Sequence, residues 1–476
     1  MSLSTALSTA MTGLTATNRA ASVASDNIAN ALTEGFARRE IELGARQVGQ
    51  GVSVLAVDRV VDKAALQDLR QVSAETGALG ERIDFLDTVT RAVGVPGDGT
   101  GLTDLVADFE AALVDAAAQP QSLPALSGAV DAAVRLTDRI NNASAVVQDA
   151  RSRADKAIGS AVASLQADLE RVADLNDDIQ RAMLGGDLPN ALLDARQTTI
   201  DRIAELVPVR EIDRGNGKVA LLSEGGLLLD GNPVSLEFST AATVEPASEV
   251  GGALSQVSVN GTPVDTSRAK HILSGGRLQA LFDVRDVDGP AAQTTLDALA
   301  HDLATRSAPV DAASVGLFTD AGLAVSATTP PPPTPPLGLA ERLSVNYRVI
   351  DDAWRLRDGL SESVPGLEGN ATRLRAYADA LSTVAAPAST ALGVTERDGH
   401  GVFSDAVSAL TVKRDGMETH LVHASAREAA LTERMGADGV DTDSEMQALL
   451  LIERSYAANA RVISTAGRMI DTLLEI

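Results

Sequence analysis

Residues 2–30 read SLSTALSTAMTGLTATNRAASVASDNIAN, and this stretch decides the fold. Its small and apolar residues recur at alternating steps of three and four, the heptad spacing of a helix that pairs along one seam. The seam positions are Leu3, Leu7, Ala10, Leu14, Thr17, Ala21, Ala24 and Ile28. Asn27 and Asn30, followed by Thr33-Glu34-Gly35, are helix-stop and turn signals.

Charge is nearly absent from this stretch. Arg19 and Asp26 are its only charged residues, and the faces away from the seam consist largely of Ser, Thr, Asn and Ala. An ordinary helix with a solvent-facing side carries more charge than this. We therefore expect more than one side of the helix to be covered in the final assembly.

A matching seam occupies the last part of the sequence. Its positions alternate again by three and four: Leu449, Ile452, Tyr456, Asn459, Ile463, Ala466, Ile470 and Leu473. Asn459 is polar, and a polar residue on such a seam usually sets register or partner choice. Upstream, Thr442 and Glu445 fit a capping box that fixes the start of the helix. Because terminal segments fray unless they dock, each end is predicted to dock, with the other end of the chain as the nearest candidate.

Between the ends, the spacing of apolar residues changes from a helical period to a period of two and back. Turn signals between short alternating runs in residues 208–266 indicate a small antiparallel β unit. The predicted fold class is mainly α with smaller β portions (α+β): an elongated, multi-domain subunit whose N- and C-terminal helices form a coiled-coil core domain. The predicted divisions are 1–61 and 442–476 for the core domain, 62–207 for a long-helix middle domain, 208–275 for the β unit, 276–365 for a mixed segment with a Pro-rich loop at 330–336, and 366–441 for returning helices of the middle domain.

Composition limits the possible functions. The chain has 476 residues, enough for about three domains at roughly 150 residues each. Its 40 Lys and Arg against 65 Asp and Glu give a net charge of −25, which argues against nucleic acid and membrane surfaces as partners. Cysteine is absent and aromatic residues make up 2%, so closely packed helices are expected rather than a thiol site or a deep ligand pocket.

Targeting signals of the common kinds are missing too. No apolar run approaches the roughly 18–20 residues of a membrane span. The first residues have neither the basic start nor the continuous apolar run of a secretory signal. We expect a protein that is cytosolic or leaves the cell by a route without a cleaved signal.

The sequence contains no complete motif for catalysis or metal binding. No G-x-S-x-G, H-E-x-x-H or P-loop pattern occurs, and Gly97 to Gly101 has the wrong spacing for a dinucleotide loop. His420 and His423 lie three apart without a third ligand nearby, which favours a solvated helix face over a metal site. The acidic residues from Asp438 to Glu445 do not fit a calcium loop and are better explained by helix capping. The sequence therefore predicts no enzyme activity, no cofactor and no metal.

Two terminal blocks resemble a known family. The run Ser25-Asp26-Asn27-Ile28-Ala29-Asn30, followed by Thr33-Glu34-Gly35-Phe36, resembles the N-terminal signature of the bacterial flagellar rod, hook and hook-associated proteins. RSYAANARVI at 454–463, with DTLL at 471–474, resembles their C-terminal signature. Ala31 and Glu34 depart from the family pattern, which often has Asn and Pro there.

Two middle blocks point to one branch of this axial family. Residues 102–183, with PNALLDAR at 189–196, look like the helical region of the hook-associated protein that starts the hook–filament junction. GGRL at 275–278, with Asp283, Arg285 and Asp286, fits the same branch's G-G-x-L…D-x-R-D stretch. Hook and rod proteins are mostly β between their terminal helices and lack this block. The resemblance is weakest over 241–255 and 308–336.

The resemblance implies a structural role at the junction between hook and filament. Its implied partners are the hook protein, the second hook–filament junction protein and further copies of the chain in a ring or helical zone. It also implies export in an unfolded state through the flagellar type III apparatus, with a cytosolic chaperone on the C-terminal helix. The expected assembly interface comprises Leu3, Leu7, Ala10, Leu14, Ala21, Asn27, Ile28 and Asn30 at one end, and Leu449, Ile452, Tyr456, Asn459, Ile463, Ile470 and Leu473, which also bind the chaperone, at the other.

Two alternatives remain open at this stage. Within the family, the chain is a hook or distal-rod protein; outside it, residues 208–340 hide an enzyme such as a cell-wall hydrolase. Because isolated terminal helices are marginal in water, we also expect rapid amide exchange at both ends of the free monomer. Assembly is expected to quench that exchange.

Overall fold

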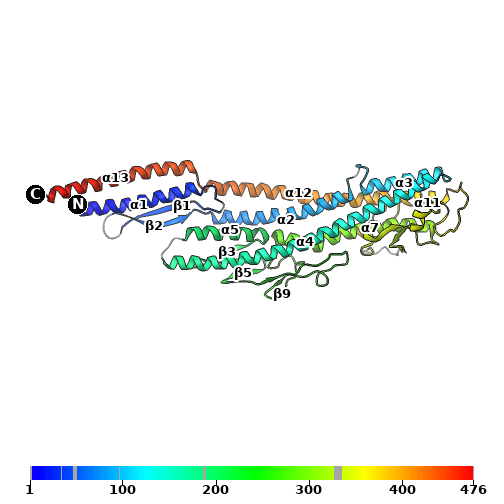
Figure 1. Cartoon of the computed structure of the whole chain (residues 1–476), viewed down its shortest axis with the longest axis horizontal. Coiled ribbons are helices and arrows are strands. Elements are labelled where there is room, and N and C mark those ends of the chain that lie inside the picture. The colour runs from blue at the N-terminus through cyan, green and yellow to red at the C-terminus, as the bar shows by residue number, and fades with distance from the viewer. Residues whose placement is uncertain are drawn as a thin grey trace.

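A long two-helix projection and a thicker helical body make up the molecule, and both chain ends lie at the tip of the projection (Figure 1). The computed structural model describes residues 3–33, 35–46, 51–95, 97–185, 189–325 and 335–474. Of residues 473 and 474 it describes the backbone alone. Helices dominate and the β structure is confined to small antiparallel sheets. The predicted fold class, mainly α with smaller β portions, is confirmed.

The projection, which we call the terminal unit, is built from both ends of the sequence. α1 and α13 run side by side in opposite directions, and a two-stranded hairpin packs on α1 (Figure 1). Its elements are α1 (Leu3–Ala29), β1 (Arg39–Ala45), β2 (Val52–Arg59) and α13 (Thr442–Leu474). The chain therefore closes on itself here, as the matched seams predicted.

Long helices carry the chain away from the terminal unit and back. α2 begins after Asp62, whose carboxylate accepts hydrogen bonds from the backbone of Ala64 and Ala65 and so caps the helix. α12 returns along α2, where Arg434 reaches Asp62 at 2.7 Å and ties the two helices together near the terminal unit. The helices of this part are α2 (Lys63–Val93), α3 (Leu102–Ala118), α4 (Leu123–Gly185), α5 (Asn190–Leu206) and α12 (Gly399–Ala437).

The β region consists of two small antiparallel sheets. One sheet has the strand order β3-β4-β5-β6, and the other has the order β7-β8-β9. Their strands are β3 (Arg210–Gly215), β4 (Lys218–Ser223), β5 (Gly226–Asp230), β6 (Asn232–Pro233), β7 (Leu236–Glu237), β8 (Ser258–Val259) and β9 (Thr262–Pro263). Both sheets pack against α4.

Further helices, turns and short strands complete the body and extend to its end far from the chain termini (Figure 1). They are α6 (Gly276–Asp283), a π-helical turn (Val284–Asp288), α7 (Gly289–Ser307), a 3₁₀ turn (Ala308–Asp311), β10 (Phe318–Asp320), β11 (Leu323–Ala324), α8 (Leu339–Arg342), β12 (Leu343–Val345), α9 (Tyr347–Asp351), α10 (Arg355–Asp358), α11 (Thr372–Ser382) and a second 3₁₀ turn (Thr390–Leu392). β11, β10 and β12 form a third sheet of the body. Most of the expected Pro-rich loop, 330–334, lies outside the described residues.

A buried charge network holds the loop between β7 and β8 against α4. Arg285 is fully buried and donates to a carboxylate oxygen of Asp155 at 2.7 Å and to the Ser255 carbonyl at 3.1 Å. Arg151 of α4 donates to the carbonyls of Glu245 and Ser248 in the same loop. The loop is therefore fixed by its backbone carbonyls, which two buried guanidinium groups bind.

Candidate assembly interface

The two predicted seams face each other in one antiparallel register. A Cβ atom on Gly13 would lie 2.8 Å from Nδ2 of Asn459, so the helices approach closely where a glycine meets the polar seam residue. Asn27 lies fourteen residues after Gly13 in α1, and Glu445 lies fourteen residues before Asn459 in α13. The side chain of Asn27 donates a hydrogen bond to Oε1 of Glu445 at 3.1 Å. This register sets Leu14 beside Asn459.

The seam of α1 is more completely covered than the seam of α13. Ala10 and Ala24 are buried, and the other six predicted positions of α1 are half-buried. On α13, Ala466 is buried, whereas Tyr456 is 42% exposed and Ile470 is 36% exposed. The remaining α13 positions with described side chains, Leu449, Ile452, Asn459 and Ile463, are half-buried. Leu473 lies in α13, but its side chain is outside the description, and the part these residues play in assembly stays a prediction.

A second side of α1 is covered by the hairpin. Thr12 lies opposite the seam, and its hydroxyl accepts a hydrogen bond from the backbone of Val52 in β2 at 3.3 Å. Ala16 and Val23, which lie on the same side of the helix as Thr12, are buried. The low charge of α1 thus accords with burial on two sides, by α13 and by the hairpin of the same chain.

Asn27 joins the three layers of the terminal unit at its base. Its side chain accepts from the backbone N–H of Arg39 at 3.0 Å and donates to the backbone carbonyl of Arg39 at 2.9 Å. The same amide group also donates to Glu445, and Asn27 is only 1% exposed. One side chain therefore links α1, β1 and α13, whereas Asn30 bonds only to the carbonyl of Asp26 and to Thr33 nearby.

The predicted capping box at the start of α13 is wrong. The carboxylate of Asp441, not a pair of Thr442 and Glu445, accepts the backbone N–H groups of Asp443 and Ser444. Glu445 is turned inward to Asn27, and its carboxylate also lies 3.6 Å from Arg38. Glu445 therefore acts as a tertiary contact, and the cap comes one residue earlier.

α5 supports the terminal unit from the body. The carboxylate of Asp194 accepts from Nε of Arg59 at 2.7 Å and from Arg39 at 3.3 Å. Asn190 donates to the carbonyl of Val57 at 3.1 Å, and the Arg39 guanidinium lies 4.8 Å from the ring centre of Phe36. The sequence reasoning matched residues 189–196 to a family block but gave Asp194 no role, because its partners are far away along the chain.

Large apolar side chains remain exposed on the terminal unit. Leu55 and Leu451 are about 60% accessible, far more than a self-sufficient packed unit leaves open. The set comprises Met11, Leu32, Leu43, Leu55, Met446, Leu450, Leu451, Tyr456, Val462, Met469 and Ile470. This surface is suited to further protein contacts.

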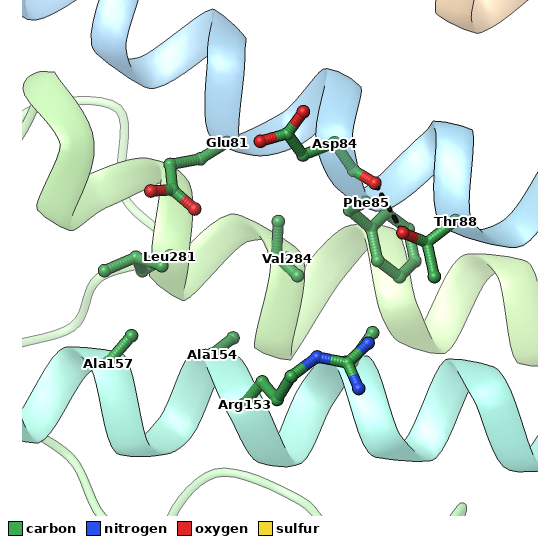
Figure 2. A pocket seen from close by; sticks show the side chains of 10 residues that line it. Glu81, Asp84, Phe85, Thr88, Arg153, Ala154, Ala157, Leu281 and Val284 are labelled. Atoms are coloured by element: carbon green, nitrogen blue, oxygen red, sulfur yellow. Dashed lines mark hydrogen bonds between the residues drawn. The ribbon is translucent and has the colours of Figure 1, made fainter.

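A hollow in the body offers little chemistry. The hollow lies between α2, α4 and the α6 region and has a volume of about 240 Å³. Figure 2 shows the side chains of Asp84, Phe85, Arg153 and Val284 around it. Within the described ranges, no group of three or more His, Asp or Glu side chains is placed to hold a metal ion. No helix within those ranges is both long and apolar enough for a membrane crossing.

The glycine loop and the histidine pair have structural explanations. The carboxylate of Asp104 in α3 accepts the backbone N–H groups of Gly97 and Gly99, which makes this a connection between helices. His420 and His423 are both exposed on α12, as predicted for a solvated face.

Comparison with known families matches three parts of the chain. Residues 94–325 match the family described as "Flagellar hook-associated protein FlgK helical domain". Residues 7–36 match "Flagella basal body rod protein", and residues 435–476 match "Flagellar basal body rod FlgEFG protein C-terminal". The two axial segments are those that form the terminal unit, and the helical-domain match covers much of the body.

Individual relatives agree with these domain matches. The chain is 24% identical to flagellar hook-associated protein 1 of Escherichia coli over 312 residues, which is 63% of this chain and 55% of that protein. It is 22% identical to the Bacillus subtilis protein of the same name over 511 residues, 98% of this chain and 97% of that protein. The matched region thus spans about half the length of the Escherichia coli relative and nearly all of the Bacillus subtilis one.

A solved structure is also similar in part. The flagellar hook junction protein FlgK of Burkholderia pseudomallei aligns with a TM-score of 0.45 at 20% identity, over 53% of this chain and 46% of that one. The assignment rests on the domain matches at both ends and in the middle, and on the relative matched over nearly its full length. The chain belongs to the flagellar hook-associated protein 1 family.

Proposed function

We propose that this chain is a structural subunit of the bacterial flagellum that forms the junction between hook and filament and is needed for filament assembly. The observation that carries the proposal is the combination of two axial-family ends, folded into one antiparallel terminal unit, with a hook-associated helical domain between them. The alternative of a hook or distal-rod protein lacks support from the middle match.

The partners follow from the same placement. The terminal unit contacts the hook protein on one side and the second hook–filament junction protein on the other, with copies of the chain side by side in a ring or helical zone. Its seam residues, from Leu3 to Asn30 and from Leu449 to Leu473, form the assembly interface. The exposed apolar side chains of α13 support this role and that of a binding site for a cytosolic export chaperone.

The protein works outside the cell, after unfolded export through the flagellar type III apparatus. Nucleic acid and membranes are not among its partners. We propose no enzymatic activity, and purified protein that reproducibly cleaved peptidoglycan would contradict this. The six-part division of the chain predicted from the sequence is part of the proposal; its first boundary coincides with the Asp62 cap of α2.

The test is complementation of a strain that lacks the chromosomal gene. Full-length protein is expected to restore filaments and, when labelled, to appear in a thin zone at the end of the hook. Deletion of residues 1–28 or 446–476 is expected to abolish filaments while the body stays folded by circular dichroism. Val422→Glu, on an exposed face of α12, is the control that should leave filaments intact.

Two results would overturn the proposal. Normal filaments in cells that carry either deletion would show that the terminal unit is dispensable. Label along the whole hook, rather than at its end, would favour the hook or rod alternative.

A further inference from the structure

The side of α13 that faces away from α1 carries a line of arginines. Arg454, Arg461 and Arg468 are spaced by seven, so they lie on one stripe over about 21 Å of helix. All three are exposed, and none makes an ion pair with another described residue. They are the only basic residues of α13, in a chain of net charge −25.

The residues beside this stripe are those of an interface rather than a solvated face. Three and four residues before Arg454 lie Leu451 and Leu450, which are 62% and 49% exposed. Ala457 and Ala458 lie between Arg454 and Arg461, and both are exposed. Arginine is enriched at protein interfaces and lysine depleted, and small neighbours let a partner approach closely. We call this surface the arginine face.

The hairpin of the terminal unit presents the opposite charge. Glu40 and Glu42 alternate along β1 and therefore share a face, and Asp58 lies directly across from Glu40 in β2. All three are exposed. Like charges directly opposite in a hairpin destabilise it, and Arg38, 3.6 Å from Glu40, is the one basic partner that a described contact supplies to this group. We call this surface the carboxylate face.

An exposed leucine accompanies the carboxylate face, as two do the arginine face. Leu55 is 59% exposed, and its side chain lies over Gly44, which shares the face of Glu40 and Glu42. Both surfaces thus combine an unneutralised charged group with apolar side chains, and the charges are opposite in sign. Such a pair is complementary in both charge and hydrophobicity.

The two faces lie on opposite sides of α1. α13 packs on the α1 seam, whereas the hairpin packs on the side that carries Thr12 (Figure 1). The arginine face points away from α1, because Arg454, Arg461 and Arg468 are all half a turn from the α13 seam. Within one chain the two faces therefore cannot meet.

We propose that the arginine face of α13 binds the carboxylate face of the β1–β2 hairpin on a second copy of the chain. The contact uses different surfaces on the two copies, so it is heterologous and repeats from copy to copy around a ring or along a helix. This inference rests on the proposed axial assembly and adds the side-by-side contact within it. Guanidinium–carboxylate pairs set its register, and the exposed leucines bury against the neighbour.

Charge reversal in the complementation strain tests the contact. Arg454→Glu with Arg461→Glu, or Glu40→Lys with Glu42→Lys, is expected to reduce the protein retained at the hook end by about tenfold or more. The exported protein then appears in the medium. Combining the two pairs of changes in one chain restores the opposite charges with the sides exchanged, and is expected to recover retention and filaments. Arg171→Glu with Arg375→Glu, two exposed helical arginines elsewhere, is the matched control.

Cysteine cross-linking tests the geometry directly, because the chain has no cysteine of its own. Ala457→Cys lies on the arginine face, and Ala56→Cys lies opposite Glu42 on the hairpin. Isolated flagella that contain both variants, treated with a mild oxidant, are expected to yield cross-linked dimers of the chain. Flagella with either variant alone are expected to yield none, because the contact is heterologous.

Each outcome separates this inference from the proposed function. If wild-type protein marks the hook end and the reversed variants are retained equally well, the inference is wrong and the proposed function stands. Failure of the combined exchange to restore retention, or dimers from Ala457→Cys alone, also overturns it, as does cross-linking of Ala457→Cys to the hook protein or another axial protein instead. If wild-type protein neither marks the hook end nor restores filaments, the proposed function itself fails.

Discussion

The body and the terminal unit of this chain share the same helical spacing of apolar residues but differ in how much apolar surface they bury. In the body, α4 contributes residues such as Leu136, Ile140 and Val147, all fully buried, to one of two large hydrophobic clusters. Neither cluster includes a described residue of α1, the hairpin or α13. The terminal unit buries mainly alanines and leaves its larger side chains partly open. A heptad pattern therefore predicts pairing, but the size of the seam residues and their cover decide how much stability the pairing supplies.

The two regions also differ in how they treat charge. The body buries Arg285 and Asp155 as a bonded pair, and each buried guanidinium finds carbonyl or carboxylate acceptors. The terminal unit leaves Arg454, Arg461 and Arg468 outside any ion pair of the described residues. The buried pair of the body is thus satisfied within the chain, whereas the three arginines of α13 have no ion-pair partner among the described residues.

The largest expected effect contrasts a core truncation with a seam truncation. Phe109 is 1% exposed and packs edge-on against Phe318 at 5.7 Å, so Phe109→Ala should destabilise the body by about 3–5 kcal/mol. Ile463→Ala, at a half-buried seam position, should cost less than about 1 kcal/mol of the same unfolding transition but should impair filament assembly. Urea unfolding followed by circular dichroism measures both. A large loss from Ile463→Ala would erase the contrast.

Acid is expected to weaken the body through Asp288. Burial opposes ionisation of this carboxylate, but hydrogen bonds from Arg82 and Lys413 prevail and hold its pKa below the ordinary value of 3.8. A depressed pKa in the folded state stabilises the protein above the unfolded value, and this stabilisation is lost as the pH falls through the folded value. Burial raises the pKa of the neighbouring Asp283, which acts in the opposite sense.

The comparison of wild type with Asp288→Asn isolates the Asp288 contribution. The variant should be less stable at pH 7, and the difference between the two proteins should shrink below about pH 4. Urea midpoints across this pH range supply the measurement. A difference that stayed constant with pH would show that the carboxylate charge of Asp288 contributes nothing to stability.

A smaller and local effect is expected at the base of the terminal unit. Asn27→Ala removes both side-chain bonds to the backbone of Arg39 and leaves the buried carboxylate of Glu445 without its amide partner. The loss should be about 1–3 kcal/mol in local opening. It should appear as faster amide exchange at Arg39, with little change in the unfolding of the body. Asn30→Ala is the control, because its side chain bonds only within its own turn.

The smallest expected free energy is that of local opening of the terminal unit in the wild-type monomer. Amides in the middle of α1 and α13 are expected to exchange far faster than those of α4, because neither helix contributes a described residue to the two large hydrophobic clusters. In isolated flagella the same amides should be protected. Strong protection in the monomer would show that the pair is stable without neighbours and that assembly adds little to it.

The seams and their partnership were predictable from the sequence because they depend on local spacing alone. Asn459 occupies a predicted seam position, and the structure sets it against Gly13, the neighbour of the seam residue Leu14. The node around Asn27 was not predictable, since its partner Glu445 also fits a local capping pattern. Glu445 fits both a helix cap and an inward contact in the sequence, and only the structure shows that it contacts Asn27.

The support from α5 and the division of the β region were beyond sequence reasoning for other reasons. Asp194 and Arg59 are 135 residues apart, and a single sequence carries no signal that pairs two charges at that distance. The second sheet consists of strands of two residues, such as Leu236–Glu237, which lie within the alternating runs of residues 208–266, but nothing in those runs tells which strands share a sheet. Its loop is held instead by Arg151 and Arg285, whose carbonyl partners have no sequence signature.

The bond between Asn27 and Glu445 joins residues 418 positions apart, and this separation governs the order of folding. Contacts that close so long a loop form late, because the chain entropy must be lost before the contact stabilises anything. Once α2 and α12 lie together, the ends of the loop are already neighbours and the terminal unit can close at little further cost. The terminal unit, the proposed assembly interface, is thus completed last. A chain that has not finished its body therefore exposes no finished surface for polymerisation.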